Sequence, residues 1–308
     1  PIFEGNADGT INLEVLHALF QIPTVQTLTG EIDMHSDFLI KGNTDQNNIV
    51  QYDIKKLDGQ LILKDVDLQL IDDKREFENI AGRVYLNGDE AGIDNVKLRV
   101  KHSDFALNGV FSNLAEYISS QGKLVADVSI NSNLIVLEDL GTEAKEEIVL
   151  RERAYILPND IAGNMYVEIG NLKYDTHTFK DISGNMSVNE RKVHFSKIAI
   201  KTGGADVYGS LTIDEKTPEI FHISSQVVSD NINFTKLFKE WDDFKQTVIK
   251  SSNIEGEAKA NVSFEAPFDL RSGVISNAIV ANIGIQIDNG RLKNVETFNS
   301  IISSLKSS

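Results

Sequence analysis

Apolar and polar residues alternate with a period of two along much of this chain, and that pattern limits its fold more than any other feature. The pattern is clearest over residues 279–287, where every odd position is apolar and the even positions are mostly polar or small. A period of two sends alternate side chains to opposite faces of a β-strand. We therefore expect a strand with one face shielded from water, followed by a tight turn at 288–290, which reads Asp-Asn-Gly.

The same alternation recurs in many short segments separated by turn residues. Parallel neighbours would need long crossover connections, usually helices, and most of these segments have no helical pattern between them. The sequence therefore predicts a mainly β protein with an antiparallel sheet. The clearest further runs are 96–100, 124–130, 198–200, 207–213 and 258–264.

One phrase occurs twice, about a hundred residues apart. Residues 77–82 and 179–184 both read Phe-x-x-Ile-x-Gly, and each copy follows a strand pattern that opens with glycine, at Gly59 and at Gly163. Recurrence at a fixed period indicates a repeat architecture. We predict one continuous elongated array with four parts. These are a partial repeat with a short helix (1–58), a repeat with a charged loop at 138–153 (59–160), a repeat with an amphipathic helix (161–255), and a partial repeat ending in a helix (256–308).

A few short amphipathic helices are expected between the strands, at 12–20, 113–120, 233–250 and 294–305. The segment 233–250 has one apolar stripe that includes Trp241. It could cap an apolar cavity or touch a membrane interface. Its polar face mixes acids and bases, which favours the plainer interpretation of a helix packed over the end of a sheet.

Charge and composition exclude several classes of function. The formal net charge is −16, and such a surface repels phosphate groups, so nucleic acid and electrostatic membrane docking are disfavoured. Without cysteine the chain has no disulfide, no cysteine-ligated zinc and no thiol nucleophile. No stretch is long and apolar enough for a membrane-spanning helix. Because it starts at Pro1 without methionine, the chain is interpreted as part of a longer protein.

No pattern indicates catalysis or a metal site. The six histidines are scattered singly, and Asp33, His35 and Asp37 alternate as expected for a wet outer face. Residues 87–98 only loosely match a calcium loop, since Leu98 stands where the bidentate glutamate belongs. We predict a protein that is not an enzyme and has no cofactor. A glycosidase would need two carboxylates converging in a cleft.

The apolar strand faces leave two alternatives open. Two sheets could close on each other, so that the alternation describes only a core. Alternatively, one sheet could curl along its length, so that its apolar face lines a groove for acyl chains. Alternation alone does not separate these structures.

The chain resembles the AsmA family of Gram-negative envelope proteins, most closely their C-terminal part. The resemblance spans about residues 59–305 and rests on the glycine-opened strands, the phrase at 179–184, the stretch Leu237–Phe244, which reads Leu-Phe-Lys-Glu-Trp-Asp-Asp-Phe, and the ending 285–294. Proteins of this kind are held in the inner membrane by an N-terminal helix and extend a β-rich body into the periplasm. They are similar to bridge-like lipid-transfer proteins, whose repeated β-groove units form an apolar trough.

That resemblance implies a function and a set of partners. We expect a non-catalytic periplasmic protein that shields the acyl chains of phospholipid or another lipid, for transport to the outer membrane or for its assembly. We also expect attachment to the inner membrane through an anchor absent from this chain. The alternative is a structural or adhesive β-sandwich module with a self-filled core and no lipid. The groove-lining candidates are Leu98, Val100, Leu124, Val128, Ile130, Ile198, Ile200, Ile279, Ala281, Ile283, Ile285 and Ile287.

Overall fold

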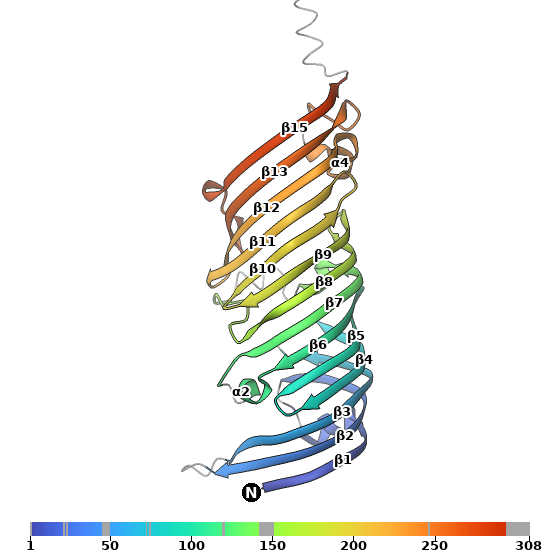
Figure 1. The fold of residues 1–308 in the computed structure, drawn as a ribbon, viewed down its shortest axis with the longest axis vertical. Helices are drawn as coiled ribbons and strands as arrows, with labels where there is room; N and C mark the ends of the chain where they lie inside the picture. The colour runs from blue at the N-terminus through green and yellow to red at the C-terminus, as the bar shows by residue number, and fades with distance from the viewer. Residues whose placement is uncertain are drawn as a thin grey trace, which may run out of the picture.

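The computed structural model describes residues 2–293, apart from residues 21, 23, 45–49, 72, 74, 119–120, 142–150 and 246. The described strands form one 15-stranded sheet, ordered along the chain from β1 to β13, with β14 and β15 both pairing with β13. Figure 1 shows the strands stacked along the long axis, from the blue N-terminal strands to the red β15. The predicted mainly β, elongated fold is therefore confirmed.

The strands have the following bounds: β1 Ile2–Asn12, β2 Val25–Thr44, β3 Val50–Leu70, β4 Glu76–Asn87, β5 Glu90–Val100, β6 Ser103–Ser112, β7 Leu124–Val136, β8 Ile161–Tyr174, β9 His177–Asn189, β10 Lys192–Lys201, β11 Asp206–Thr217, β12 Ile220–Asn233, β13 Ile254–Asp269, β14 Gly273–Val274 and β15 Val280–Leu292. The helices are α1 Leu13–Phe20, α2 Leu114–Ile118 and α4 Phe234–Glu240, with short 3-10 turns η1 Leu137–Leu140, η2 Asp242–Lys245 and η3 Ser276–Ala278.

The pairing is antiparallel between all neighbouring described strands except β7 and β8, which run parallel. The sheet is therefore antiparallel, as predicted, except at this one pair of strands. Two adjacent parallel strands need a connection that returns to the starting edge of the sheet, and residues 137–160 make it. The sequence pattern marked 138–153 as a charged connector but gave no sign that the connector changes strand direction.

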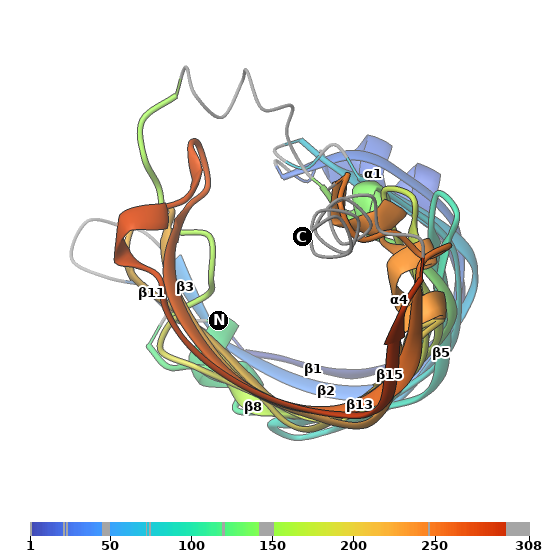
Figure 2. The ribbon, with the colours of Figure 1, turned by 90° about the horizontal axis from the view of Figure 1, so that it is seen from above.

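The sheet curls about the long axis into an open trough (Figure 2). Figure 2 shows α4 on the inner side of the wall. Helix α4 packs against β12 and β13, where Phe234 and Leu237 contact the buried Ala205, Ile232 and Ala258. Residues directly opposite one another on paired strands share a face, so the pairing register extends the inner face from this point to the rest of the sheet.

One row of directly opposed residues crosses the whole inner face. We call it the central row. It contains no charged side chain, and the large apolar residues outnumber the glycines and the one serine. From β1 to β15 its members are Gly9, Met34, Leu61, Val84, Ile93, Gly109, Val128, Met165, Met186, Phe195, Leu211, Ser225, Phe264 and Ala281.

The repeated phrase encodes the same local distortion in β4 and β9. The residue before its isoleucine has a left-handed backbone, with φ 54° at Asn79 and 48° at Asp181. Asn and Asp tolerate this conformation better than other residues with a side chain. The register shifts beside both residues, so the phrase marks a β-bulge. The proposed repeat boundaries stay a prediction, and the sheet runs through them without a break.

The helices only partly follow the sequence pattern. Asn12 caps α1 by accepting a hydrogen bond from the Val15 backbone N–H at 3.0 Å, and Asn233 caps α4 in the same way through Lys236. The predicted helix over 233–250 is too long, since α4 spans only Phe234–Glu240. It stops at Glu240 because residues 242–245 all have positive φ. The helix expected over 294–305 lies outside the described residues.

The prediction of a tight turn at 288–290 is also wrong. Strand β15 continues to Leu292, and the Asp-Asn-Gly sequence forms an irregularity within it. Asn289 takes a left-handed φ of 53°, and the register against β13 shifts between Asp288 and Arg291. The residues that favour a turn here make a bulge instead, because β13 extends far enough to pair with both sides of it.

Candidate binding groove

Eleven of the twelve groove-lining candidates lie on the inner face, on the same side as the central row. Two are in β5, three in β7, two in β10 and four in β15. The register that places them is independent of the sequence periodicity, since it comes from backbone pairing. The exception is Ile279, which precedes β15 and ends the turn η3.

The inner face is crowded but has no second layer of strands over it among the residues that the structure describes. The buried apolar residues there are mainly small, such as Ala126, Val128 and Ala258. Larger inner residues, such as Met165 and Phe195, stay partly exposed. A sandwich core would bury these large side chains almost completely. The two-sheet arrangement left open by the sequence is therefore not the one seen here.

Exposure is greatest at the C-terminal end of the sheet. The side chains of Ile283, Ile285 and Ile287 are 64%, 57% and 56% exposed, although they face inward. These residues lie on β15, which has β13 as its strand partner on one side. The apolar lining thus reaches the last described strand without becoming polar.

One rim of the trough is formed by residues 151–160, which run past the ends of five strands, β9 to β13. Arg153 pairs with Asp269 in β13 at 2.8 Å, and Arg151 donates a hydrogen bond to Glu219 at 2.6 Å. The backbone N–H of Arg191, between β9 and β10, donates to the Pro158 carbonyl at 3.3 Å. We call residues 151–160 the rim segment.

Two buried carboxylates hold the rim segment in place. Glu215 accepts hydrogen bonds from the backbone N–H groups of Ile156 and Leu157, the latter at 2.6 Å. Glu219 is wholly buried and lies between the guanidinium groups of Arg271 and Arg151. The hydrogen bond from Arg271 is the main reason that the pKa of the Glu219 carboxyl lies below its usual value.

The opposite rim carries η1 and α4. Asp139 in η1 is buried and accepts a hydrogen bond from the His102 backbone N–H at 3.0 Å, between β5 and β6. Near α4, the Trp241 ring contacts His177 with 4.2 Å between ring centroids. These contacts agree with the interpretation of the Trp241 segment as a packed element at the end of the sheet.

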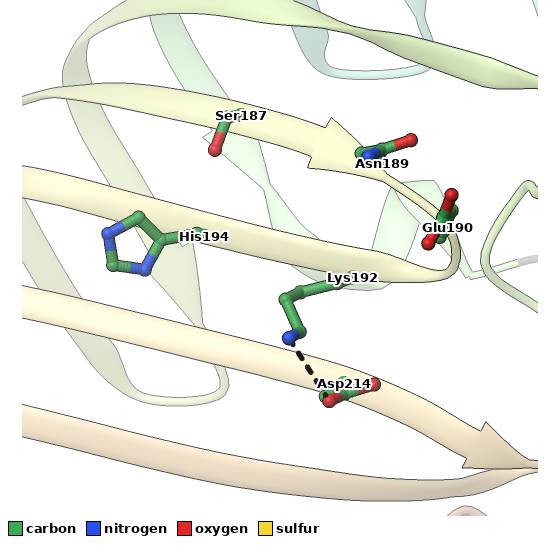
Figure 3. A pocket seen from close by; sticks show the side chains of 6 residues that line it. All are labelled: Ser187, Asn189, Glu190, Lys192, His194 and Asp214. Atoms are coloured by element: carbon green, nitrogen blue, oxygen red, sulfur yellow. Dashed lines mark ion pairs between the residues drawn. The ribbon is translucent and has the colours of Figure 1, made fainter.

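The outer face is mainly polar, although Val125, Tyr208 and Val228 are exposed on it, and it holds shallow depressions. Figure 3 shows one, lined by six polar residues of β9, β10 and β11 and the turn between β9 and β10. Lys192 pairs there with Asp214 at 3.5 Å, and the His194 ring lies 2.9 Å from the Thr212 hydroxyl. These polar groups satisfy one another on an open surface, which gives a ligand little to bind.

Asp33, His35 and Asp37 also lie on the outer face, as predicted. Lys64 forms an ion pair with Asp33 and is the main cause of the lowered pKa of its carboxyl group. His35 pairs instead with Asp8 at 3.0 Å. Asp37 lies 3.6 Å from Lys56, so the three side chains serve separate surface contacts.

Several other site types find no support in the part of the chain that the structure describes. No three His, Asp or Glu side chains gather closely enough there to hold a metal ion. Within the same residues, no helix has the length and apolar character needed to cross a membrane. Comparison with known proteins gives no match, whether with protein-family models, with curated proteins or with solved structures.

The sequence did not point to the rim residues. Glu215 and Glu219 flank a surface-like Lys-Thr-Pro turn, and Arg151 and Arg153 lie in a segment dense in charge. The one available signal is that this segment connects two strand blocks. The two arginines in this segment need acidic partners. Glu219 and Asp269, in later parts of the sheet, supply them.

Proposed function

We propose that this protein is a non-catalytic carrier that shields lipid acyl chains along the inner face of its curled sheet. The central row carries the proposal. It is an uncharged, largely apolar path across fourteen strands, and the larger side chains lining it keep part of their surface exposed. A surface of this kind gains free energy by covering itself with another apolar surface.

Acyl chains fit such a path for a simple energetic reason. Burying each methylene group contributes about 0.8 kcal/mol, and the contribution does not depend on direction or on charge. A lipid bound through its acyl chains can leave its headgroup in water above the rims. The net charge of −16 is then no obstacle, since no cationic headgroup site is required.

The resemblance to the AsmA family sets the cellular context of the proposal. We place the protein in the periplasm, held at the inner membrane by an anchor outside this chain. The ligand is phospholipid or another lipid with acyl chains, on its way to the outer membrane or used in its assembly. The curled sheet supports this context because a trough-shaped β body is what the resemblance implies.

Photo-crosslinking tests the proposal at two adjacent positions of β8. Met165 lies in the central row, whereas Tyr166 faces outward and is 45% exposed. Benzophenone amino acids placed at positions 165 and 166 differ mainly in the face of the sheet from which they project. We expect lipid adducts in cells from position 165 and few or none from position 166, with phospholipid released when the purified protein is extracted.

Two outcomes would contradict the proposal. Equal adducts from both positions would indicate nonspecific contact with membranes. No adduct from 165 and no co-purified lipid would favour the structural or adhesive module, with its apolar face covered by protein. Melting curves of both labelled proteins should agree with that of the wild type, so that a failed adduct is not due to unfolding.

A further inference from the structure

Strand β15 leaves a long backbone edge without a strand partner among the described residues. Its paired edge runs against β13, from Ile254 to Glu265. Every residue of β15 is exposed. Backbone N–H and C=O groups along such an edge can pair with another strand.

The composition of β15 does not protect this edge. Residues 280–287 contain no charged residue and no proline. Natural sheets usually block free edges with lysine, proline, bulges or very short strands. In β15 the bulge comes only after Ile287, so seven residues before it, 281–287, form a regular and uncharged ladder.

The edge at the other end of the sheet is different. Strand β1 carries Glu4 and Asp8 on its outer face and has glycines at positions 5 and 9. In a self-paired β1, two acids from each copy would lie on the same face of one short ladder, and like charges there are destabilising. Of the two end strands, β15 is therefore the one suited to pairing.

We propose that β15 pairs in antiparallel fashion with β15 of a second copy of this chain. A two-fold axis perpendicular to the sheet, passing through Gly284, gives antiparallel strands and keeps both inner faces on the same side. In this register Ile283 lies opposite Ile285 of the other copy, Ala281 opposite Ile287, and Asn282 opposite Gln286. The interface is isologous, as in most homodimers.

The sequence of β15 selects this register. With the axis at Gly284, the seven opposed pairs all fall within the uncharged stretch. Moving the axis to Gln286 would set Asp288 against Gly284 and Arg291 against Ala281, and the bulge would fall inside the ladder. Moving it by one residue, to Ile285, would bring the left-handed Asn289 opposite Ala281.

The pairing joins the two inner faces into one surface. The isoleucines of β15 become interior members of a doubled sheet, with cross-strand neighbours on both sides. Dimerisation itself does not depend on the proposed lipid function. If both hold, an acyl chain has an uninterrupted apolar path from one copy to the next.

Sedimentation of the full chain tests the pairing. We expect a concentration-dependent species of twice the 34.1 kDa chain mass. Asn282→Lys with Gln286→Lys sets lysine against lysine across the axis, so this variant should be monomeric. Asn261→Lys with Ser263→Lys adds the same charges to the outer face of β13, one strand inward, and should still dimerise.

Cysteine variants test the register, because the chain has no cysteine of its own. Gly284→Cys should link to itself under mild oxidation, and a β-carbon at this position has space. Asn282→Cys should link to Gln286→Cys in a mixture but not to itself. Tyr166→Cys, on an interior strand, should give no link. A monomer at every concentration, or a dimer unaffected by the lysines in β15, would overturn the proposal.

Discussion

At the scale of single residues, the least usual feature is a pair of carboxylates buried at the edge of a sheet that has few fully buried large side chains. Glu215 binds backbone N–H groups, and Glu219 binds two arginines. A buried charge is tolerated only when it is paired and hydrogen-bonded. Glu219 meets both conditions, whereas Glu215 is satisfied by backbone hydrogen bonds alone. Together the two residues hold the rim segment along the ends of β9 to β13.

The Glu219→Gln substitution should loosen the rim segment. Glutamine cannot form ion pairs with Arg151 and Arg271, so amide exchange at Ile156 and Leu157 should become about tenfold faster or more. As a control, Asp181→Asn removes one partner of the exposed ion pair between Asp181 and Lys201. It should have little effect on amide exchange at Ile156 and Leu157. Unchanged exchange in Glu219→Gln would show that Glu215 alone holds the segment.

The same residue predicts a pH dependence of stability. The folded-state pKa of Glu219 lies below its usual 4.5, so its contribution to stability is complete above about pH 4.5 and is lost as the pH falls through the folded value. The melting temperature of the wild type should therefore exceed that of Glu219→Gln at neutral pH. The difference should close as the pH falls below about 4.5. If the difference in melting temperature persists at strongly acidic pH, the effect of Glu219→Gln comes from side-chain shape and not from charge.

At the scale of elements, bulges determine where the strands change register. Asn79 in β4 and Asp181 in β9 occupy the same place in the repeated phrase. Further bulge residues with positive φ are Asn95 in β5 and Lys197 in β10, where the register also shifts. Bulges bend a strand and increase its twist, so equivalent bulges on successive strands help to curl the sheet.

Substitution at Asn79 should separate backbone strain from side-chain loss. Asn79→Val places a β-branched residue at a φ of 54° and should destabilise the protein by about 1 to 2 kcal/mol. Asn79→Gly should cost much less, because glycine accepts this backbone and the hydrogen bond from the residue 79 N–H to Asp67 is kept. Urea unfolding of both variants measures the difference. Equal losses would mean that the asparagine side chain, and not its backbone, matters at this place.

Local patterns predicted the faces of the strands better than the path of the chain. The odd positions of 281–287 and the even positions of 124–130 were assigned to one face, and the register places them there, because strand alternation is a local property. The parallel step between β7 and β8 and the pairing of Arg151 with Glu219 join residues distant in sequence, so no local pattern contains them. Helix α4 was predicted too long because its apolar stripe continues into residues that have left-handed backbones.

At the scale of the whole molecule, the central row joins the apolar faces of the individual strands into one continuous surface. Each of the fourteen strands that the row crosses contributes a single member, and Met165 in β8 lies midway along the strand order. A continuous path makes the proposed function sensitive to any one member, because an acyl chain that travels along the inner face has to pass every strand.

Met165→Arg should therefore affect passage of lipid more than its uptake. An unpaired guanidinium in the central row is costly to cover with acyl chains, so lipid transfer between donor and acceptor vesicles should slow by about tenfold or more. Lipid that co-purifies should fall much less, since the members of the row on either side remain. Tyr166→Arg adds the same charge to the outer face of β8 and should leave both quantities unchanged. If Met165→Arg transfers lipid at the wild-type rate while keeping its melting temperature, lipid does not travel the length of the inner face, and the trough would store lipid instead of conducting it.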